Sequence, residues 1–526
     1  MNSCKMYFSG LNALCSRMTL PRLLPMQRFS LFFTCLRRLK RVSAFLVAIV
    51  LSALAFGPAF AGGGSGGLSG SVAGEILVKL RTQAALPPLL SPPYSLLKLS
   101  QFGSRPIYRM QVPSGTTVDS SLALLAGNAD VLLAEPNYVH QSPEARKNVA
   151  WTVGLPSAYT AQWAPQAIHL ANAQRFATGA GIRVAVLDTG VDSSHPALAG
   201  KLLPGWNFVD NNANTSEVGT QANLGFGHGT HVAGLVALTA PDAKIIPYRV
   251  LDQNGEGNVW VLAEALLRAI DPDGNPATDD GAHVINMSLG TLNRTKILSA
   301  IAQLSSCAAS NSADPITDFS HSGYDDDRTR CANSKGVVIV AAAGNGSSSN
   351  ALEYPAAEGS VGLISVGASD ATQRLASFSN FGSWVDVTAP GDGITSSIPG
   401  GGYAVWSGTS MAAPMVAGAV ALLRSREPSL APVDVARRVI RSGSKLLGAN
   451  SSNLRQIDLA AVATPCSMDI DGDGKTLATT DGLIVFRVMM GMTDAAVSSA
   501  AAPGSPRNSW DAIRSYLIGS CGTNLP

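Results

Sequence analysis

The amino-acid sequence predicts an α/β fold for residues 162–464, with a parallel sheet flanked by helices on both faces. Short apolar segments alternate there with helical segments, which is the order of βαβ units. The apolar segments are nearly continuous, as in strands buried on both faces. Asp188 and Ser288 close or follow expected strands, at the edge where parallel sheets collect functional groups. The expected strands are 183–187, 244–250, 283–287, 337–342 and 363–366, and the expected helices are 231–238, 259–270, 297–304 and 410–424.

Two smaller units flank this stretch. Residues 74–141 mix strand-like and helical spacing, which predicts a small α+β domain. Residues 466–526 hold an acidic loop and helical spacing, which predict a small helical module with a calcium loop. The 46% apolar and 14% charged residues support folded rather than disordered units. The strands expected in the first unit are 75–80, 107–112 and 131–134, with a helix at 118–126; the helices expected in the last unit are 482–490 and 510–517.

The first 61 residues carry the pattern of an export signal. Basic residues cluster at 37–41, an apolar run follows at 42–56, and Ala59-Phe60-Ala61 offers a small-x-small cleavage site. The apolar run is shorter than the roughly 20 residues of a spanning helix. We therefore expect cleavage after Ala61, a secreted chain and no stable membrane span, against the alternative of a retained anchor. The stretch before Met26 is unusual for a signal, so Met26 stays open as the true start.

Charge and cysteine content agree with an exported protein. The formal net charge is +2 and the expected mature part has no basic block, so nucleic acid is not an expected partner. Four cysteines follow the signal, and an even count in an oxidising compartment predicts two disulfides. Three pairings are open. Sequence neighbourhood favours Cys307–Cys331 and Cys466–Cys521, with free buried thiols as the alternative.

Three motifs supply the groups that activate a serine hydroxyl. A serine is a weak nucleophile until a base takes its proton, and histidine does this near neutral pH. The histidine in turn needs a buried carboxylate that fixes its tautomer. A serine that opens a helix also faces the positive end of the helix dipole, where its N–H can donate to an oxyanion. The motifs are VLDTG at 186–190, GHGTHVAG at 227–234 and GTSMAAP at 408–414.

These motifs resemble those of the subtilisin family, across about 162–464. The order Asp, His, Ser along the chain is that of subtilisin. The resemblance implies that Asp188 orients the imidazole, that His228 rather than His231 is general base and then acid, and that Ser410 is the nucleophile. Asn345, in the run AAGN at 342–345, resembles the asparagine of the family's oxyanion hole. The implied function is a serine endopeptidase that acts on proteins or peptides and needs no cofactor for its chemistry.

Other functions fit the sequence less well. Aspartic proteases also use Asp-Thr-Gly, but they need two such lobes and only one is present. Serine-carboxyl proteases replace the histidine with an acid, and His228 opposes that class. A non-catalytic binding protein on a protease scaffold is opposed by the intact motifs. Between a broad degradative protease and a processing protease with few targets, the sequence does not decide.

Two segments resemble the family's substrate-binding strands. An extended peptide would add between them as a further strand. The segment Ser288-Leu289-Gly290, with the run AAG at 342–344, would also line the primary specificity pocket. The segments are Ser288-Leu289-Gly290 and Gly255-Glu256-Gly257.

Glu353 precedes Tyr354-Pro355-Ala356, which resembles a family segment at the base of that pocket. If Glu353 points into the pocket, its buried carboxylate would favour Lys or Arg before the scissile bond. If Glu353 points to solvent, no such preference follows. Both orientations stay open from the sequence.

The calcium sites of the family are only partly supported. Many subtilisins hold calcium with an Asp after His-Pro, but this chain has Ala197 there. The acidic loop from Asp271 to Asp280 is either a metal site or a solvated loop. The tail gives a stronger signal, because its acidic loop matches the start of an EF-hand and resembles a dockerin loop. One such loop is clear, whereas dockerins carry two, which argues against cohesin binding. The expected calcium residues are Asp469, Asp471, Asp473, Lys475 and Asp481.

The unit at 74–141 resembles the inhibitory propeptide of subtilisins, most clearly at Glu135-Pro136-Asn137-Tyr138. The resemblance implies that this unit assists folding and then places its last strand in the active site. The chain would thus be its own inhibitor until it cuts itself between Val139 and Gln162. An unrelated α+β domain is the alternative.

Overall fold

The computed structural model describes residues 70–103, 105–146, 151–273, 275, 278–305, 336–448, 454–523 and 525. The expected export signal at 1–61 and the expected pair Cys307–Cys331 lie outside these residues. Within the described part of the chain, every helix is too short or too polar to cross a membrane.

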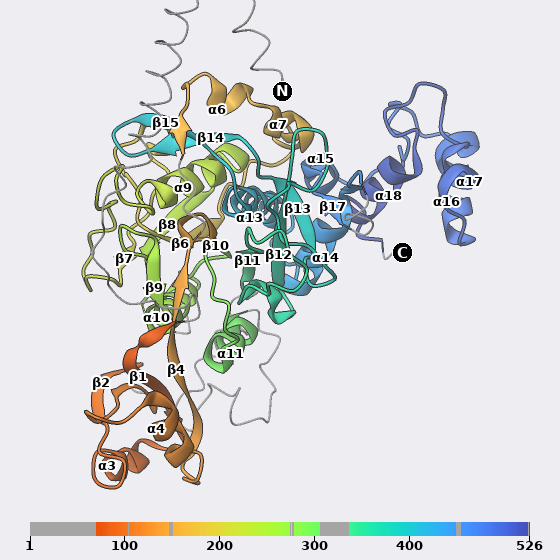
Figure 1. The fold of residues 1–526 in the computed structure, drawn as a ribbon. Helices are drawn as coiled ribbons and strands as arrows, with labels where there is room; N and C mark the ends of the chain where they lie inside the picture. The colour runs from red at the N-terminus through yellow and green to blue at the C-terminus, as the bar shows by residue number, and fades with distance from the viewer. Residues whose placement is uncertain are drawn as a thin grey trace, which may run out of the picture. The chain divides into compact units, whose positions relative to one another are not determined.

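A nine-stranded sheet forms the centre of the α/β unit at residues 162–464 (Figure 1). Its strands run parallel except for the antiparallel pair β16–β17 at one edge. Each strand expected from the sequence is present, and the order is β16-β17-β13-β12-β11-β10-β6-β8-β7. The bounds are β6 Arg183–Asp188, β7 Trp206–Asn207, β8 Lys244–Arg249, β10 Val284–Met287, β11 Val338–Ala342, β12 Leu363–Ser369, β13 Val387–Pro390, β16 Ser444–Lys445 and β17 Arg455–Gln456.

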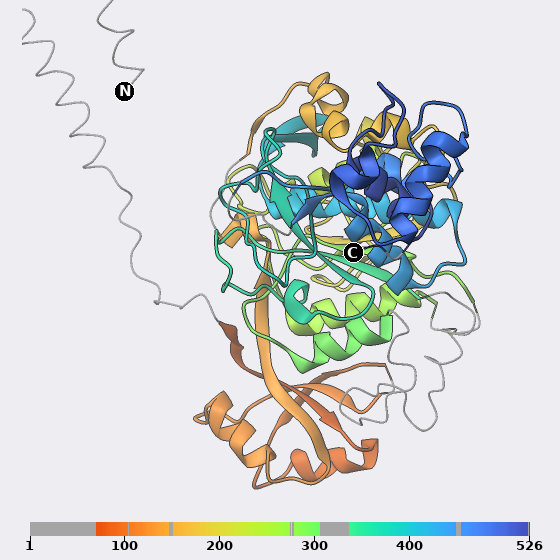
Figure 2. The same ribbon diagram turned by 90° about the vertical axis from the view of Figure 1, so that its right-hand side faces the viewer.

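Helices cover both faces of this sheet, as predicted. Alternate strand residues point to opposite faces, so Val184 packs in one apolar cluster with α9 and α13, whereas Ala185 packs in another with α10 and α11. Figure 1 labels these two pairs of helices on opposite sides of the strands, and Figure 2 shows the green helices α10 and α11 side by side. The bounds are α6 Ala158–Ala161, α7 Trp163–Ala167, α8 Leu170–Ala173, α9 His228–Thr239, α10 Val259–Ile270, α11 Lys296–Ser305, α13 Thr409–Arg426, α14 Pro432–Ser442 and α15 Leu459–Ala463.

A smaller antiparallel sheet, β14-β15-β5, was not expected from the sequence. Its strands are β5 (Thr152–Val153), β14 (Ile394–Ile398) and β15 (Gly402–Trp406). Ser and Gly interrupt the apolar pattern of these strands, so they lack the continuous runs that marked the parallel sheet. The hairpin β14–β15 matters for function because it leads directly into α13.

Residues 71–141, where the sequence predicts a small α+β unit, form an antiparallel sheet with its own apolar core. Its last strand, β4, is much longer than the predicted 131–134, and its end pairs with β9 of the α/β unit at 162–464. This extension carries the chain toward the ends of the parallel strands. The bounds are β1 Ser71–Leu80, α3 Leu86–Leu89, β2 Leu97–Gln101, β3 Ile107–Gln111, α4 Val118–Leu125, β4 Val131–Gln141, α5 Pro143–Arg146 and β9 Glu256–Asn258.

The tail folds around its own small core, which includes Ile470, Ile484 and Tyr516. The predicted disulfide Cys466–Cys521 joins its two ends. The last helix also packs against α14 and α15, and Arg438 of α14 donates to the carbonyl oxygens that end it. The tail is therefore attached to the larger unit by contacts as well as by the chain. Its helices are α16 Leu483–Met489, α17 Asp494–Ser498 and α18 Trp510–Gly519.

Candidate active site

Three elements of the fold bring the motif residues Asp188, His228 and Ser410 together. Asp188 is the last residue of β6, His228 the first of α9 and Ser410 the second of α13. His228 Nδ1 lies 2.7 Å from Asp188 Oδ1. His228 Nε2 and Ser410 Oγ contact one and the same oxygen atom, at 3.1 and 2.5 Å. All three side chains are fully or almost fully buried.

The start of α9 is fixed tightly against the end of β6. A Cβ at Gly229 would lie 2.2 Å from the carbonyl oxygen of Gly190, so the motif needs glycine at this position. Glu217, which the sequence did not single out, accepts hydrogen bonds from the N–H of Thr230 and from the hydroxyl of Thr189. A carboxylate at a helix N-terminus is stabilising because it faces the positive end of the dipole. This network holds His228 beside Asp188.

The second motif histidine has a different role. His231 is buried, and its Nε2 lies 3.2 Å from the carbonyl oxygens of Ile394 and Ala404 in β14 and β15. Burial lowers the pKa of His231 to about 3. His231 is thus a neutral residue that joins α9 to the hairpin, and the choice of His228 for the relay agrees with these contacts.

Asn345 follows β11 and lies beside the start of α13. Its Oδ1 accepts hydrogen bonds from Thr409, from the N–H at 2.9 Å and from the hydroxyl at 3.0 Å. Because Oδ1 is held by Thr409, Nδ2 of the amide points toward Glu144, the residue whose carboxylate contacts Ser410. Nδ2 donates to the carboxylate of Glu144 at 2.8 Å. The geometry is that of a donor aimed at an oxygen beside the serine.

The oxygen between His228 and Ser410 belongs to Glu144 of α5, a residue that sequence reasoning did not identify. Ser410 Oγ donates to its Oε2 at 2.5 Å, and its Oε1 accepts from Asn345. Burial by itself would raise the pKa of Glu144, but the contacts with His228, Ser410 and Asn345 lower it. Burial by itself would lower the pKa of His228, but Asp188 and Glu144 raise it to about 10. His228 therefore lies between the carboxyl groups of Asp188 and Glu144, and both contacts favour its protonated form.

The end of β4 lies between the two predicted substrate-binding segments. Gln141 and Gly290 exchange two backbone hydrogen bonds, of 2.9 and 3.0 Å. On its other side β4 pairs antiparallel with β9, where His140 is opposite Gly257, and the N–H of Ser142 donates to the carbonyl of Gly255 at 3.1 Å. Both segments therefore pair with an extended backbone, here one from the chain itself. Ser288 and Leu289, which precede Gly290, are fully buried.

Glu353 is buried and pairs with Arg146, so its side chain does not point to solvent. The terminal nitrogens of Arg146 lie 2.8 and 2.7 Å from the two carboxylate oxygens of Glu353. Arg146 Nη2 also donates to the carbonyl oxygen of Gly290 at 3.0 Å. Burial raises the pKa of Glu353, and the charge of Arg146 opposes that shift. The buried carboxylate of Glu353 therefore forms an ion pair with Arg146.

The predicted segment from Glu135 to Tyr138 anchors β4 to the surface helices. The carboxylate of Glu135 accepts from the N–H groups of Lys296 and Ile297 at the start of α11. Asn137 Oδ1 accepts from the N–H of Trp260 in α10. Both side chains cap helix N-termini, where backbone donors lack partners. These caps align the strand that continues into the site.

Two acidic clusters could hold a cation. In the tail, oxygens of Asp469, Asp471 and Asp473 lie within 4.8 Å of one another. Asp481 folds back on the loop, where its Oδ1 accepts from the N–H groups of Ile470 and Asp471. The second cluster consists of Asp271, Asp273 and Asp280. At Ala197, where the sequence offers no calcium ligand, the backbone N–H donates to Nδ1 of His195 at 3.1 Å.

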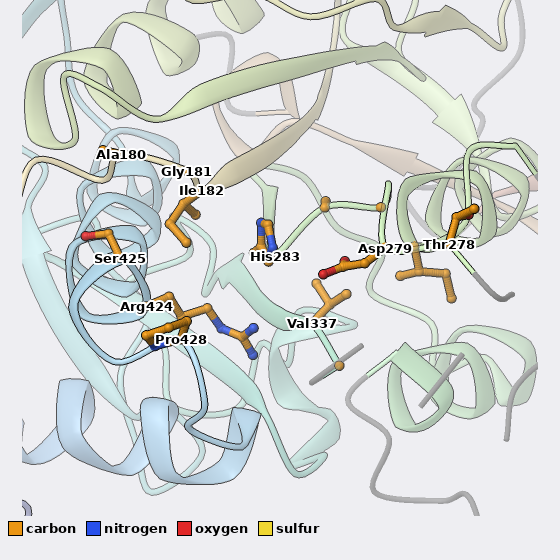
Figure 3. A pocket seen from close by; sticks show the side chains of 14 residues that line it. Ala180, Gly181, Ile182, Thr278, Asp279, His283, Val337, Arg424, Ser425 and Pro428 are labelled. Carbon is orange, nitrogen blue, oxygen red and sulfur yellow. The ribbon is translucent and has the colours of Figure 1, made fainter. Parts of the chain in front are cut away.

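A pocket of about 280 Å³ lies away from Asp188, His228 and Ser410, and Asp279 is part of its lining (Figure 3). It is lined by Ile182, His283 and Val337, which immediately precede β6, β10 and β11, and by Arg424 near the end of α13. The pocket is therefore at the amino ends of the parallel strands, opposite the edge that carries Asp188. It does not take part in the site described above.

Comparisons with known proteins identify the family of the chain. The subtilase family (peptidase S8) matches residues 179–456, which is 278 of the 526 residues. A thermophilic serine proteinase of Bacillus sp. (strain AK1) is 36% identical over 342 residues, which cover 63% of this chain and 72% of that protein. Thermitase of Thermoactinomyces vulgaris is 37% identical over 297 residues, which cover 54% of this chain and 90% of that protein.

A solved structure adds support for the fold. Fervidolysin from Fervidobacterium pennivorans, a keratinolytic enzyme related to subtilisin, superposes with a TM-score of 0.58 at 24% identity. The superposition covers 77% of this chain and 63% of that one. With the parallel sheet, the flanking helices and the extent of the sequence matches, the chain belongs to the subtilase family and is a serine-type endopeptidase of the subtilisin type.

Proposed function

We propose that the protein is a secreted serine endopeptidase, made as a zymogen, in which Asp188, His228 and Ser410 form the catalytic triad. The observation that carries this proposal is the 2.7 Å contact between Asp188 and His228, with the far nitrogen of His228 and the hydroxyl of Ser410 on one shared oxygen. Secretion by the full chain, followed by hydrolysis of casein in the medium, tests the proposal. A folded, exported and trimmed chain that cuts no protein would contradict it.

The triad acts on a peptide bond in two steps. His228 takes the proton of Ser410 while Oγ attacks the scissile carbonyl, and Asp188 stabilises the imidazolium that forms. Nδ2 of Asn345 donates to the negative oxygen of the tetrahedral intermediate. The intermediate collapses as His228 protonates the leaving amine, which leaves an acyl group on Ser410. Water, deprotonated by His228, then attacks the acyl carbonyl, and Ser410 recovers its proton as the acid product leaves.

The unit at 74–141 is proposed to be the propeptide of this zymogen. Two observations support this role: the helix caps from Glu135 and Asn137, and the placement of Gln141 between the substrate-binding segments. A segment that occupies the substrate cleft excludes other substrates until it is cut and released. The pattern at 1–61 supports secretion, with the disulfide Cys466–Cys521 suited to an oxidising compartment.

Glu353 is proposed to select substrates with Lys or Arg before the scissile bond, because a buried carboxylate binds a cation strongly. Glu353→Gln is expected to lower kcat/KM for such substrates by about 10- to 100-fold, since a hydrogen bond to a charged group contributes about 1.5–3 kcal/mol. Substrates with Leu or Phe at the same place are expected to change by less than about threefold, because they do not use the charge. Paired fluorogenic peptides that differ only at this residue measure both effects.

Glu358→Gln is the matched control for that variant. Glu358 lies five positions later and pairs with Arg294 outside the pocket, so its loss is expected to leave the ratio between basic and apolar substrates unchanged. Equal losses on both kinds of substrate in Glu353→Gln would show that Glu353 supports the fold of the pocket and does not select the substrate.

The tail is proposed to bind calcium through Asp469, Asp471 and Asp473, with the backbone carbonyl of Lys475 and the carboxylate of Asp481. The fit is supported by the three clustered carboxylates and by Asp481, which is buried and folded back on the start of the loop. Calcium would neutralise this concentration of negative charge and would hold the loop in its turn.

Removing calcium is therefore expected to lower the melting temperature of the tail. At a concentration 100 times the dissociation constant, the bound ion contributes about 2.7 kcal/mol, so a chelator should shift the transition by several degrees. Asp473→Asn keeps an acceptor for the N–H of Lys475 but should abolish the calcium-dependent shift. Asp494→Asn, in the same module but outside the loop, should retain it. A shift that survives in Asp473→Asn would place the ion elsewhere, for which the cluster at Asp271 is available.

A further inference from the structure

The carboxylate of Glu144 occupies the position in which a scissile carbonyl would react. Its Oε1 accepts from Nδ2 of Asn345 at 2.8 Å, and its Oε2 accepts from Oγ of Ser410 at 2.5 Å. The same Oε2 lies 3.1 Å from Nε2 of His228. A Cβ at Gly408 would lie 1.6 Å from Oε1, so the backbone before Ser410 has space for this carboxylate only because residue 408 is glycine. Glu144 itself is fully buried.

This set of contacts is that of a reaction product. Hydrolysis of a peptide bond releases a carboxylic acid, which ionises and leaves one oxygen beside the oxyanion donor and the other beside the serine and the histidine. A carboxylate there has no leaving group, and its negative charge opposes nucleophilic attack. Glu144 therefore contacts Ser410, His228 and Asn345 with a carboxylate that Ser410 cannot cleave.

The backbone path of the segment leads away from a cleavable geometry. Up to Ser142 the chain is extended and pairs with β9. It then turns into the single helical turn α5, in which the N–H of Arg146 donates to the carbonyl of Ser142 at 3.2 Å. Two side chains on this turn contact the site, Glu144 at Ser410 and Arg146 at Glu353. The turn supplies a side-chain carboxylate at the serine instead of a backbone carbonyl.

We propose that Glu144 is an internal product mimic that keeps the uncleaved precursor inactive, and that its displacement from Ser410 limits the rate of maturation. This inference rests on the proposed function, because it regulates the same triad. It adds a second means of inhibition to simple occupation of the cleft: a specific carboxylate that disables the nucleophile, the base and the oxyanion donor together.

The charge of Glu144 also disables the base. A histidine can accept the proton of Ser410 only when its Nε2 is free of one, and an imidazolium between two carboxylates retains that proton. The charged and titratable groups around this pair are Asp188 and Glu217 at the end of β6 and the start of α9, His231 on α9, and Arg146 with Glu353 in the pocket. Asp188 remains beside His228 after Glu144 leaves, so Glu144 is the one of the two carboxylates that can be removed from His228.

The test is the reaction of the intact precursor with a fluorophosphonate, followed by intact-mass spectrometry, which separates labelled precursor from labelled mature enzyme. The wild-type precursor is expected to react at least about tenfold more slowly than the mature form. Glu144→Ala and Glu144→Gln are expected to raise the labelling rate of the precursor by about tenfold or more, and to shorten the time to maturation. Asp130→Asn removes an exposed carboxylate of the same unit and is expected to behave as wild type.

The outcomes separate this inference from the proposed function. The inference about Glu144 is wrong if both Glu144 variants label as slowly as the wild-type precursor while the mature enzyme labels rapidly. It is also wrong if the wild-type precursor already labels as fast as the mature form. If the mature enzyme does not label at all, the proposed triad is wrong.

A second measurement covers variants that fold poorly. Nitrogen NMR of the unprocessed Ser410→Ala precursor at pH 8 is expected to show His228 as an imidazolium, and the same chain with Glu144→Gln is expected to show a neutral ring. A neutral His228 in the Ser410→Ala precursor that retains Glu144 would overturn the inference.

Discussion

Ser410→Ala is expected to lower kcat/KM of the mature enzyme by about 10⁶-fold, the loss typical when the nucleophile of such a triad is removed. The hydroxyl of Ser410 is the group proposed to form the acyl intermediate, and it contacts the same carboxylate of Glu144 that His228 and Asn345 contact. Ser410 Oγ also contacts the carbonyl of Ser288 at 3.2 Å, but the observed pairing with an extended backbone uses Gly290 and Gly255–Gly257, so KM should change little. Hydrolysis of a basic fluorogenic peptide measures both constants. The variant should also accumulate as the full-length precursor, so its mature form must be produced by adding a trace of active enzyme.

Ser425→Ala is the matched control on the same helix. Its hydroxyl donates to the carbonyl of Leu422 within α13, far along the helix from the triad, so full activity is expected. A Ser410→Ala enzyme that retains more than about one thousandth of wild-type kcat would exceed the residual rate that the oxyanion donor and substrate binding provide without a nucleophile. That result would assign the chemistry to another residue.

Asn345→Ala is expected to lower kcat by about 10²–10³, which corresponds to about 2.7–4 kcal/mol of transition-state stabilisation. The amide has two separate functions in the structure: Oδ1 accepts from Thr409, and Nδ2 faces the oxygen at Ser410. The donor gains strength only as negative charge develops, so KM should remain within about threefold. Steady-state kinetics on a single peptide, with active sites titrated, measures the split between the two constants.

Asn345→Asp separates the two functions of the amide. The new carboxylate keeps an acceptor for Thr409 but replaces the donor with a negative charge, so it should lower kcat at least as much as Asn345→Ala does. If Asn345→Asp were nearly as active as wild type, the contribution of Asn345 would be the position of Thr409 and the start of α13, and not the oxyanion.

The candidate triad could be predicted because each of its residues lies in a short sequence motif. Asp188, His228 and Ser410 each stand at an element boundary, and the periodic apolar runs around them placed those boundaries within a few residues. Asn345 was singled out by its resemblance to the asparagine of the family's oxyanion hole, and it follows a buried strand. Sequence neighbourhood favoured the disulfide Cys466–Cys521 among three possible pairings, and the structure contains it. The match of the acidic loop to the start of an EF-hand predicted the cluster of Asp469, Asp471 and Asp473.

Glu144 and Arg146 could not be predicted in this way. Residues 142–146 show no periodicity, and a proline followed by charged residues is typical of an exposed linker. Their role depends on the long extension of β4, whose mixed sequence did not mark it as a strand beyond residue 134. One signal was present: Glu353 at the base of a pocket requires a cation, and a search for a basic residue just after the propeptide would have found Arg146.

The most direct test of the triad is peptide mapping of the mature enzyme after inactivation by a fluorophosphonate. The triad predicts one adduct, on the Oγ of Ser410, with loss of activity in proportion to labelling and no adduct in His228→Ala at the same exposure. An enzyme that loses its activity through an adduct on another residue, or that remains fully active once Ser410 is labelled, would contradict the assignment of Ser410 as the nucleophile.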